Sequence, residues 1–285
     1  ETFLREAIKS VLNQSYKKWE LIFWDNNSTD KSAQIFKSFK DKRLKYFFRK
    51  RKVSLYESRN SAIKKAKGEF IAFLDADDLW CSNKLFLQKK KFKDPKVGLV
   101  YGKYLKINEY SFLRRKQLIT KKQLPEGYIT NNLLKFYSVG LLTIMLRKKF
   151  LSHSKIFKTE YNYLGDLDFV LRFSLKYKFA AVQKVVGIYR QHENQMQRKY
   201  YKTKSDQFSK WFKEISKKRI LGKNSNLVVL EEWERFFSNL TKVKNRRSFS
   251  LLLKILRYPN NFNKIKLLIV FFTPEFMSKK IIGET

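Results

Sequence analysis

Three carboxylates lie close together directly after an apolar segment, in a chain with only 25 acidic residues. They belong to Asp75, Asp77 and Asp78, and the apolar segment covers residues 70–74. Hard cations such as Mg²⁺ and Mn²⁺ commonly bind through one or two carboxylates together with phosphate oxygens of a substrate. A solvated turn with an aspartate cap is the alternative. Because three adjacent carboxylates repel one another without a counter-ion, we favour a cation site here.

A second pair of carboxylates, Asp166 and Asp168, lies at the start of a helix that the apolar pattern predicts over residues 166–177. The dipole at a helix start stabilises anions, so capping explains this pair equally well. His192 is one of two histidines and follows a predicted strand over residues 180–189. A lone histidine in such a place is more often a loop residue than a ligand.

A third polar segment, Asp25–Asp30, follows the apolar residues 19–24. Asparagine, aspartate, serine and threonine are ordinary turn residues, so this segment has little functional weight by itself. It still lies at a strand end, as Asp75 does. Because ligands bind beyond the carboxyl ends of the strands in α/β sheets, these two segments predict one crevice at one sheet edge.

Helices and strands alternate along the part of the chain that must position these residues. The predicted helices cover residues 3–13, 33–39 and 54–67, and the predicted strands cover residues 19–24, 44–49 and 70–74. The third helix opens with Ser54 and Glu57, which match a capping box. Short connections between such elements predict an α/β fold with a doubly wound, mostly parallel sheet flanked by helices.

The pattern is less regular beyond residue 80. Further strands are predicted over residues 97–106, 140–147 and 180–189, with helices over 85–92, near 130–137 and over 166–177. From about residue 200 the chain changes to helices rich in Lys, Arg and aromatic residues, which predicts a helical C-terminal appendage.

The net charge of +38, from 63 basic and 25 acidic residues, indicates attraction to polyanions such as nucleic acid, an anionic membrane surface or a phosphorylated substrate. A plain bias toward lysine explains the charge equally well. The single Cys81 excludes an internal disulfide framework and a thiolate zinc site, and it fits a cytoplasmic protein. No apolar run reaches the ~18–20 residues that span a bilayer.

Four segments, in this order, resemble the family 2 glycosyltransferases, which are inverting enzymes of the GT-A fold. These segments are Ala7–Gln14, Trp24–Asp30, Ser58–Ile63 and Ala66–Asp78. The resemblance extends from residue 3 to about residue 195. Each segment is weak alone, and their order and intervals make the signal specific.

The resemblance implies roles on the donor side of an active site. Asp25 matches the family's aspartate that contacts the nucleotide base, with Asn26 as its neighbour. Arg59 matches an arginine near the base and the diphosphate. Asp75 and Asp77 match the aspartates of the family's D-x-D motif, and Asp77 is the preferred residue for direct contact with the metal.

The resemblance also implies a catalytic side. Asp166 matches the catalytic base, which in the family usually follows a glutamate that Gly165 replaces here. Asp168 is the second choice for this base. His192 matches a histidine that completes the metal site in some members.

From the resemblance we expect transfer of a sugar from a nucleoside diphosphate, first of all a UDP-sugar, to a glycan or lipid-linked hydroxyl acceptor. The expected cofactor is Mg²⁺ or Mn²⁺, and the expected role is synthesis of cell-surface polysaccharide or lipid-linked glycan. We expect residues 1–106 to bind the nucleotide sugar, residues 107–200 to bind the acceptor and carry the base, and residues 201–285 to form the basic extension. The family's opening strand would precede Glu1, so we expect a first segment to be missing.

Two other functions are compatible with the residues alone. The charge and the aromatic content allow a basic nucleic-acid-binding protein, but no recognised motif supports specific nucleic-acid binding. A metal-dependent nucleotidyltransferase would share the acidic chemistry, but it needs a glycine-rich loop that the sequence lacks. The apolar stretch Ile265–Pro274 has basic neighbours and suits an interfacial helix, so peripheral association with the inner face of the plasma membrane is a further expectation.

Overall fold

The computed structural model describes residues 1–109, 116–119, 122–151, 156–192, 201–217 and 249–257, and also residues 231, 234, 265, 267, 268, 271 and 272. The chain divides into two compact units, Glu1–His192 and Glu193–Thr285. The described elements of the first unit are α1 (Leu4–Leu12), β1 (Leu21–Asp25), α2 (Ser32–Lys37), β2 (Leu44–Phe48), α3 (Leu55–Lys65), β3 (Phe70–Ala72), β4 (Leu79–Trp80), α4 (Lys84–Lys91), β5 (Val97–Asn108), β6 (Lys116–Leu118), α5 (Thr130–Lys135), η1 (Leu141–Thr143), β7 (Met145–Arg147), η2 (Lys148–Phe150), α6 (Gly165–Ser174) and β8 (Lys178–Gln191).

The strands of the first unit form two sheets. In the small sheet β1 pairs in parallel with β2, and in the large sheet the long strands β5 and β8 also pair in parallel. The short strands β3, β7, β4 and β6 add antiparallel pairings to the large sheet. The predicted α/β class is confirmed, and the predicted parallel arrangement holds in the two longest pairings.

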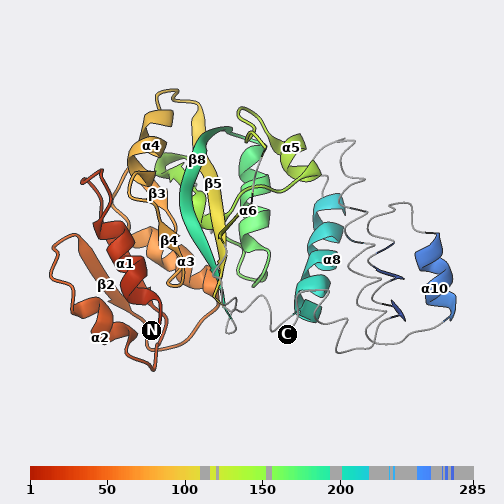
Figure 1. Ribbon diagram of the computed structural model, residues 1–285, viewed down its shortest axis with the longest axis horizontal. Coiled ribbons are helices and arrows are strands. Elements are labelled where there is room, and N and C mark those ends of the chain that lie inside the picture. The colour runs from red at the N-terminus through yellow and green to blue at the C-terminus, as the bar shows by residue number, and fades with distance from the viewer. Residues whose placement is uncertain are drawn as a thin grey trace. The chain divides into compact units, whose positions relative to one another are not determined.

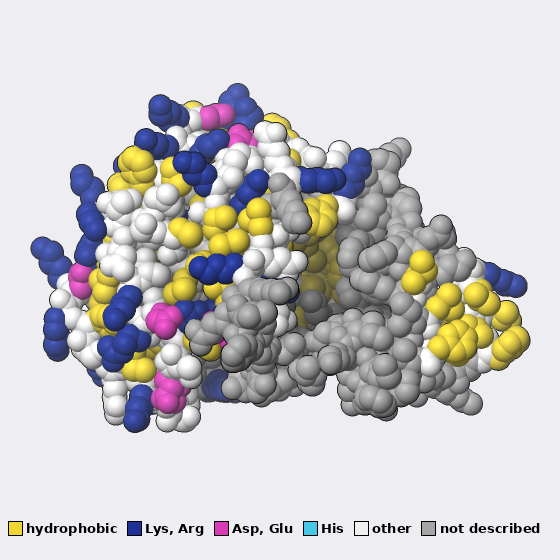
Figure 2. Space-filling model, viewed as in Figure 1, with side chains coloured by type: hydrophobic (Ala, Val, Ile, Leu, Met, Phe, Trp, Pro, Cys, Tyr) yellow, Lys and Arg dark blue, Asp and Glu magenta, His cyan; other side chains and the backbone are white. Residues whose placement is uncertain are grey.

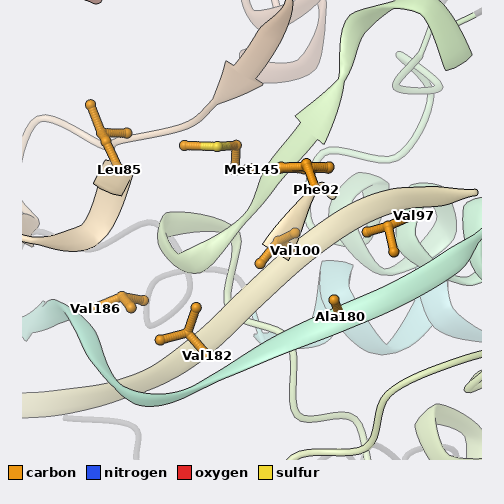
Figure 3. Packing of buried hydrophobic residues seen from close by; sticks show 8 residues of the cluster. All are labelled: Leu85, Phe92, Val97, Val100, Met145, Ala180, Val182 and Val186. Carbon is orange, nitrogen blue, oxygen red and sulfur yellow. The ribbon is translucent and has the colours of Figure 1, made fainter. Parts of the chain in front are cut away.

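Helices cover both faces of the large sheet. Ala180 and Val182 of β8 pack in one apolar cluster with Leu85 of α4, and Figure 3 shows the side chains of this cluster. Phe179 instead contacts Phe173 of α6, with ring centroids 6.2 Å apart. Because neighbouring side chains of a strand point to opposite faces, α4 and α6 lie on opposite faces of β8 (Figure 1). This agrees with the doubly wound arrangement that the alternating pattern predicts.

Local signals predicted some elements well and one poorly. Ser54 caps α3 as predicted, because its hydroxyl accepts a hydrogen bond from the backbone N–H of Glu57. The predicted strand over residues 140–147 is wrong in its first half, where Leu141–Thr143 form a 3₁₀ turn and only Met145–Arg147 form a strand. Backbone hydrogen bonds and the Thr143 hydroxyl bond to the carbonyl of Gly140 close this turn. An apolar run alone does not reveal such a turn.

A cavity of about 550 Å³ lies against both sheets. Its lining includes β1 and β3 together with apolar side chains of α1 and α3. In the described part of the chain, β1 pairs only with β2 and β3 only with β7, so each of these strands has one edge without a partner.

The described residues of the second unit are helical, as predicted for the C-terminal appendage. Its helices include α8 (Tyr201–Lys217) and α10 (Phe249–Leu256). Trp211 and Ile215 of α8 are buried, as is Ile255 of α10. Most of the stretch 265–274, which the sequence suggests as an interfacial helix, lies outside the described residues. No described helix is long and apolar enough to cross a membrane.

Candidate functional site

The carboxylates that follow β3 occupy two different environments. The side chains of Asp75 and Asp77 are 46% and 32% exposed, whereas Asp78 is 3% exposed. Asp78 accepts a hydrogen bond from the backbone N–H of Arg190 in β8, 3.0 Å away. Burial, followed by the charges of Asp75 and Asp77, raises the pKa of Asp78 to about 8. Asp78 therefore holds the turn against β8, and the other two carboxylates face outward.

The two outward carboxylates have different partners. Arg59 of α3 lies 2.5 Å from an oxygen of Asp75, so the charge of Asp75 is balanced. A ring nitrogen of His192 lies 2.9 Å from an oxygen of Asp77. The sequence separates His192 and Asp77 by 115 residues, and the end of β8 brings them together. Two of the three residues that the resemblance assigns to the metal, Asp77 and His192, are therefore neighbours.

This set of donors suits a cation that also binds phosphate. Among the described residues, no group of three or more His, Cys, Asp and Glu side chains is placed to hold a metal by itself. Mg²⁺ and Mn²⁺ do not need such a cage, because they commonly bind one or two carboxylates and complete their shell with phosphate oxygens and water. Asp77 and His192 offer one carboxylate and one imidazole, and Asp75 lies two residues before Asp77 in the sequence. The residues present therefore fit a metal–diphosphate site.

The residues assigned to the nucleotide base are held by internal hydrogen bonds. Asp25, at the end of β1, is 2% exposed and accepts hydrogen bonds from the backbone N–H of Ser28 at 2.8 Å and the hydroxyl of Tyr46 at 2.6 Å. The side chain of Asn26 makes two hydrogen bonds with the backbone of Val53, at 2.8 and 3.1 Å. These bonds fix the shape of the polar turn and tie it to the segment before α3.

Asp166 lies in the first turn of α6 and contacts α3. Its Oδ1 accepts hydrogen bonds from the hydroxyl of Tyr56 at 3.2 Å and from the backbone N–H of Leu167 at 2.9 Å. Its own backbone N–H donates to the Tyr56 hydroxyl. No hydrogen bond to Oδ2 comes from any described residue, so this oxygen is free to accept a proton.

Asp168 is placed differently, although it lies only two residues further along the same helix. It is 1% exposed, and its carboxylate lies 2.7 Å from Arg172 and 3.8 Å from Lys158. A carboxylate that is buried between two cations cannot meet an acceptor without breaking these pairs. The geometry therefore supports Asp166 over Asp168 as the base.

Sequence reasoning missed Tyr46 and Tyr56, which hold two of the predicted carboxylates. Tyr46 lies in the strand β2 and Tyr56 on the buried side of α3, and in such places an aromatic side chain is normally a core residue. Burial raises the pKa of Tyr46 to about 12, so its hydroxyl is a permanent donor at neutral pH. The only signal in the sequence is that Tyr56 precedes Arg59 by three residues, which puts both on one face of a helix.

Curated proteins with similar sequences are glycosyltransferases. The UDP-Glc:alpha-D-GlcNAc-diphosphoundecaprenol beta-1,3-glucosyltransferase WfgD of Escherichia coli is 35% identical over 152 residues, which are 53% of this chain and 58% of that protein. The putative teichuronic acid biosynthesis glycosyltransferase TuaG of Bacillus subtilis is 27% identical over 151 residues, again 58% of its length. The chain thus matches little more than half of either relative.

Solved structures of glycosyltransferases share the fold. S. aureus TarS 1-349 in complex with UDP-GlcNAc superposes with a TM-score of 0.62 at 19% identity, over 99% of this chain and 80% of that one. The mannosyltransferase PcManGT from Pyrobaculum calidifontis, in complex with GDP-Man and Mn²⁺, gives a TM-score of 0.58 at 16% identity, over 99% and 81% of the two chains.

The family model described as Glycosyl transferase family 2 matches residues 1–153, which include the polar turn after β1, Arg59 of α3 and the carboxylates after β3. This match covers more than half of the 285 residues. It agrees with the order of the four motifs and with the fold, and the chain therefore belongs to glycosyl transferase family 2.

Proposed function

We propose that this chain transfers a sugar from a nucleoside-diphosphate sugar to the hydroxyl of an acceptor, with inversion at the anomeric carbon. One observation carries the proposal: a single helix, α3, contacts both acidic sites. Arg59 pairs with Asp75, and Tyr56 pairs with Asp166. Residues three apart on a helix have Cβ atoms about 5–6 Å apart, so the two sites lie on neighbouring positions of one helical face. A donor at the first site would present its sugar toward the second.

On the donor side, Asp77 and His192 would hold the cation, with Asp75 nearby and Arg59 balancing its charge. When bound, the cation neutralises charge on the departing nucleoside diphosphate. Arg59 lies on the same side and can add a donor to the phosphates. Asp25 would belong to the wall of the base site, where its bonds to Ser28 and Tyr46 keep the polar turn in shape.

On the acceptor side, Asp166 would act as the general base. Its free Oδ2 takes the proton of the acceptor hydroxyl while the hydroxyl oxygen bonds to the anomeric carbon. The bond from that carbon to the diphosphate oxygen breaks on the opposite face. A single displacement inverts the configuration and needs no covalent enzyme intermediate.

Similar proteins support a proposal for the class of substrate. The name of the E. coli relative gives UDP-glucose as donor and a diphosphoundecaprenol-linked sugar as acceptor, and TarS was solved with UDP-GlcNAc. We propose a UDP-sugar donor and a glycan or lipid-linked acceptor in the synthesis of a surface polysaccharide. Incubating the protein with a panel of UDP- and GDP-sugars, and detecting products by mass, would identify the donor.

Binding of UDP in the presence of Mn²⁺ tests the site directly. We expect titration calorimetry to give measurable affinity with Mn²⁺ and strongly reduced affinity with EDTA. Asp77→Ala should abolish the part of the UDP affinity that depends on Mn²⁺. Asp94→Ala is a matched control, because Asp94 is also a surface carboxylate and lies near Lys178. Unchanged Mn²⁺-dependent affinity in Asp77→Ala would show that the site is assigned to the wrong residues.

We also propose that the protein works in the cytoplasm at the inner face of the plasma membrane, where a lipid-linked acceptor would lie. Lys and Arg side chains are spread over the visible face of the described residues (Figure 2), and the whole chain carries a net charge of +38. Such a surface is attracted to anionic lipid headgroups. The protein should sediment with anionic vesicles at low salt and be released at high salt; absence from the low-salt pellet would count against membrane binding.

Where the structure describes the chain, β1 and β3 each have an edge without a strand partner and both line the cavity, and we propose that an extended segment can bind there. Unpaired strand edges bind extended segments through their backbone groups. We would join a five-residue Val/Ile strand to Glu1 through a short linker, with a Gly/Ser extension of equal length as the control. The apolar strand should raise Tm, and donor hydrolysis should rise with it. Equal Tm in both versions would argue against a strand site.

A further inference from the structure

Helix α3 connects the donor side of the site to the proposed base through two residues. Arg59 reaches Asp75, and Tyr56, three residues earlier, reaches Asp166. The two side chains also contact each other, because the Arg59 guanidinium carbon lies 5.3 Å from the centre of the Tyr56 ring. The position of Tyr56 is therefore fixed by the same helix that fixes the donor-side arginine.

The Tyr56 hydroxyl makes two hydrogen bonds with one residue. It donates to Oδ1 of Asp166 and accepts from the backbone N–H of Asp166, each at 3.2 Å. That N–H lies in the first turn of α6, where backbone donors have no partner within the helix. Tyr56 is 3% exposed, so its ring has little room to move. One hydroxyl thus fixes both the main chain and the carboxylate of the base.

A second anchor holds α3 to the segment before α6. The Asn60 side chain donates to the carbonyl of Phe157 at 2.8 Å and accepts from its backbone N–H at 3.0 Å. The ring of Phe157 also lies against Tyr56, with centroids 5.2 Å apart. These contacts hold α3 against the segment before α6 without the Tyr56 hydroxyl, so removing the hydroxyl should release the Asp166 side chain and leave the two elements packed.

Gly165 makes room for this contact. A Cβ atom at residue 165 would lie 2.6, 2.7 and 2.8 Å from three ring atoms of Tyr56. Carbon atoms attract one another best at about 3.5–4.0 Å, so the ring occupies the space that any side chain at residue 165 would need. Glycine at residue 165 and tyrosine at residue 56 are therefore a matched pair.

We propose that Tyr56 is a positioning residue for Asp166, and that Gly165 is required because any larger residue would displace the Tyr56 ring. This inference rests on the proposed function, in which Asp166 is the base. Tyr56 fixes Oδ1, and Oδ2 is left to take the proton. Tyr56 makes no contact with the reacting atoms in this arrangement and acts only through Asp166.

Other groups also influence Asp166 electrostatically. They are Arg59 on α3, Tyr104 on β5 and Tyr137, which follows α5. Burial raises the pKa of Tyr56, of Tyr104 and of Tyr137. These tyrosines therefore stay protonated at neutral pH, and only Arg59 adds a full charge. A variant that changes Tyr56 alone leaves these other influences in place.

The first test is the pH dependence of donor hydrolysis, with UDP-glucose and UDP-GlcNAc as probes. Tyr56→Phe should lower kcat about tenfold and leave the donor KM within about twofold, because one hydrogen bond to a charged group is lost and the donor side is untouched. The low-pH arm of the kcat profile should move to higher pH, because the carboxylate anion has lost a donor. Tyr101→Phe is the matched control, since the Tyr101 hydroxyl donates one hydrogen bond to the carbonyl of Pro125. A Tyr56→Phe profile that overlaid the wild type would overturn the proposal.

The second test measures packing and needs no activity. Gly165→Ala should lower Tm clearly in the wild-type background and much less in a Tyr56→Ala background, where the ring is absent. Equal losses in the two backgrounds would contradict the matched pair.

Asp166→Asn separates this inference from the proposed function. If Asp166→Asn loses turnover while Tyr56→Phe behaves as wild type, only the positioning role is wrong. If Asp166→Asn keeps full turnover, the base is misassigned and both proposals fall.

Discussion

The carboxylates after β3 and those at the start of α6 have similar spacing, but the buried aspartate of each group has different neighbours. In each group one aspartate is buried and the others face outward. Buried Asp168 lies between Arg172 and Lys158, whereas buried Asp78 has two carboxylates as neighbours, and the backbone N–H and the charge of Arg190 offset their repulsion only in part. The α6 group therefore compensates its buried charge with cations. In the group after β3, burial and the neighbouring carboxylates of Asp75 and Asp77 make Asp78 hold its proton, and a bound cation would relieve the repulsion among these carboxylates.

This difference shows why the spacing of aspartates does not assign their roles. Asp166 and Asp168 are two residues apart in one helix, yet one has a free oxygen and the other is enclosed by ion pairs. Asp77 and Asp78 are adjacent, yet only Asp77 is exposed beside His192. Side-chain direction and the charges of distant partners decide which carboxylate can take part in chemistry.

The largest effect should come from removing the enclosed carboxylate. Asp168→Ala removes the carboxylate that pairs with Arg172 and Lys158, and breaking a buried ion pair typically costs about 3–5 kcal/mol. Arg172 and Lys158 are partly exposed, so we expect a loss near the lower end of that range in urea unfolding. Asp166→Ala, two residues away, should cost less than half as much. Equal losses of unfolding free energy in the two variants would contradict the difference between the two positions.

Replacing the buried carboxylate of Asp78 with an amide should stabilise the protein. The pKa of Asp78 is about 8 in the folded chain and 3.8 as its ordinary value. Between these pH values the unfolded chain has lost the proton and the folded chain keeps it, so wild-type stability falls as pH rises from about 4 to about 8. Asp78→Asn cannot ionise and still offers an oxygen to the N–H of Arg190. It should be more stable than wild type by on the order of 2 kcal/mol at pH 8 and by little at pH 4.

Urea unfolding in EDTA at several pH values would measure this difference. Mn²⁺ should reduce it, because a cation beside Asp77 favours the ionised form of Asp78. If the difference in unfolding free energy between Asp78→Asn and wild type did not change with pH, the raised pKa of Asp78 would be contradicted.

The smallest expected effect on stability comes from replacing His192, the partner of the exposed Asp77. His192 lies 2.9 Å from Asp77, and in the proposed site it would either bind the cation or orient Asp77 toward it. Loss of such a partner typically weakens metal affinity about 10–100-fold. His192→Ala should therefore weaken Mn²⁺ binding by that factor and leave urea unfolding in EDTA nearly unchanged. His192→Ala with wild-type Mn²⁺ affinity would remove the histidine from the site.

The sequence predicted what depends on local pattern. Apolar spacing and cap residues located α1, α3, α6 and the ends of β1 and β3, so both acidic groups were found. The i, i+4 pair of Asp168 and Arg172 is also local and could have been predicted from spacing. The contact of Tyr56 with Asp166 spans 110 residues, and that of His192 with Asp77 spans 115. Such contacts depend on how β8 and α6 pack in three dimensions, and no pattern within a single segment encodes them.

We assign cation binding to the carboxylates after β3 and proton removal to Asp166, and one paired measurement tests this assignment most directly. Mn²⁺-dependent UDP binding and turnover of the UDP-sugar would be measured side by side on Asp77→Ala and Asp166→Asn. We expect Asp77→Ala to lose both binding and turnover. Asp166→Asn should bind UDP like wild type and lose about 10²–10⁴-fold in turnover, as expected for a general base. Loss of UDP binding in Asp166→Asn, or wild-type binding in Asp77→Ala, would contradict the assignment of the two groups.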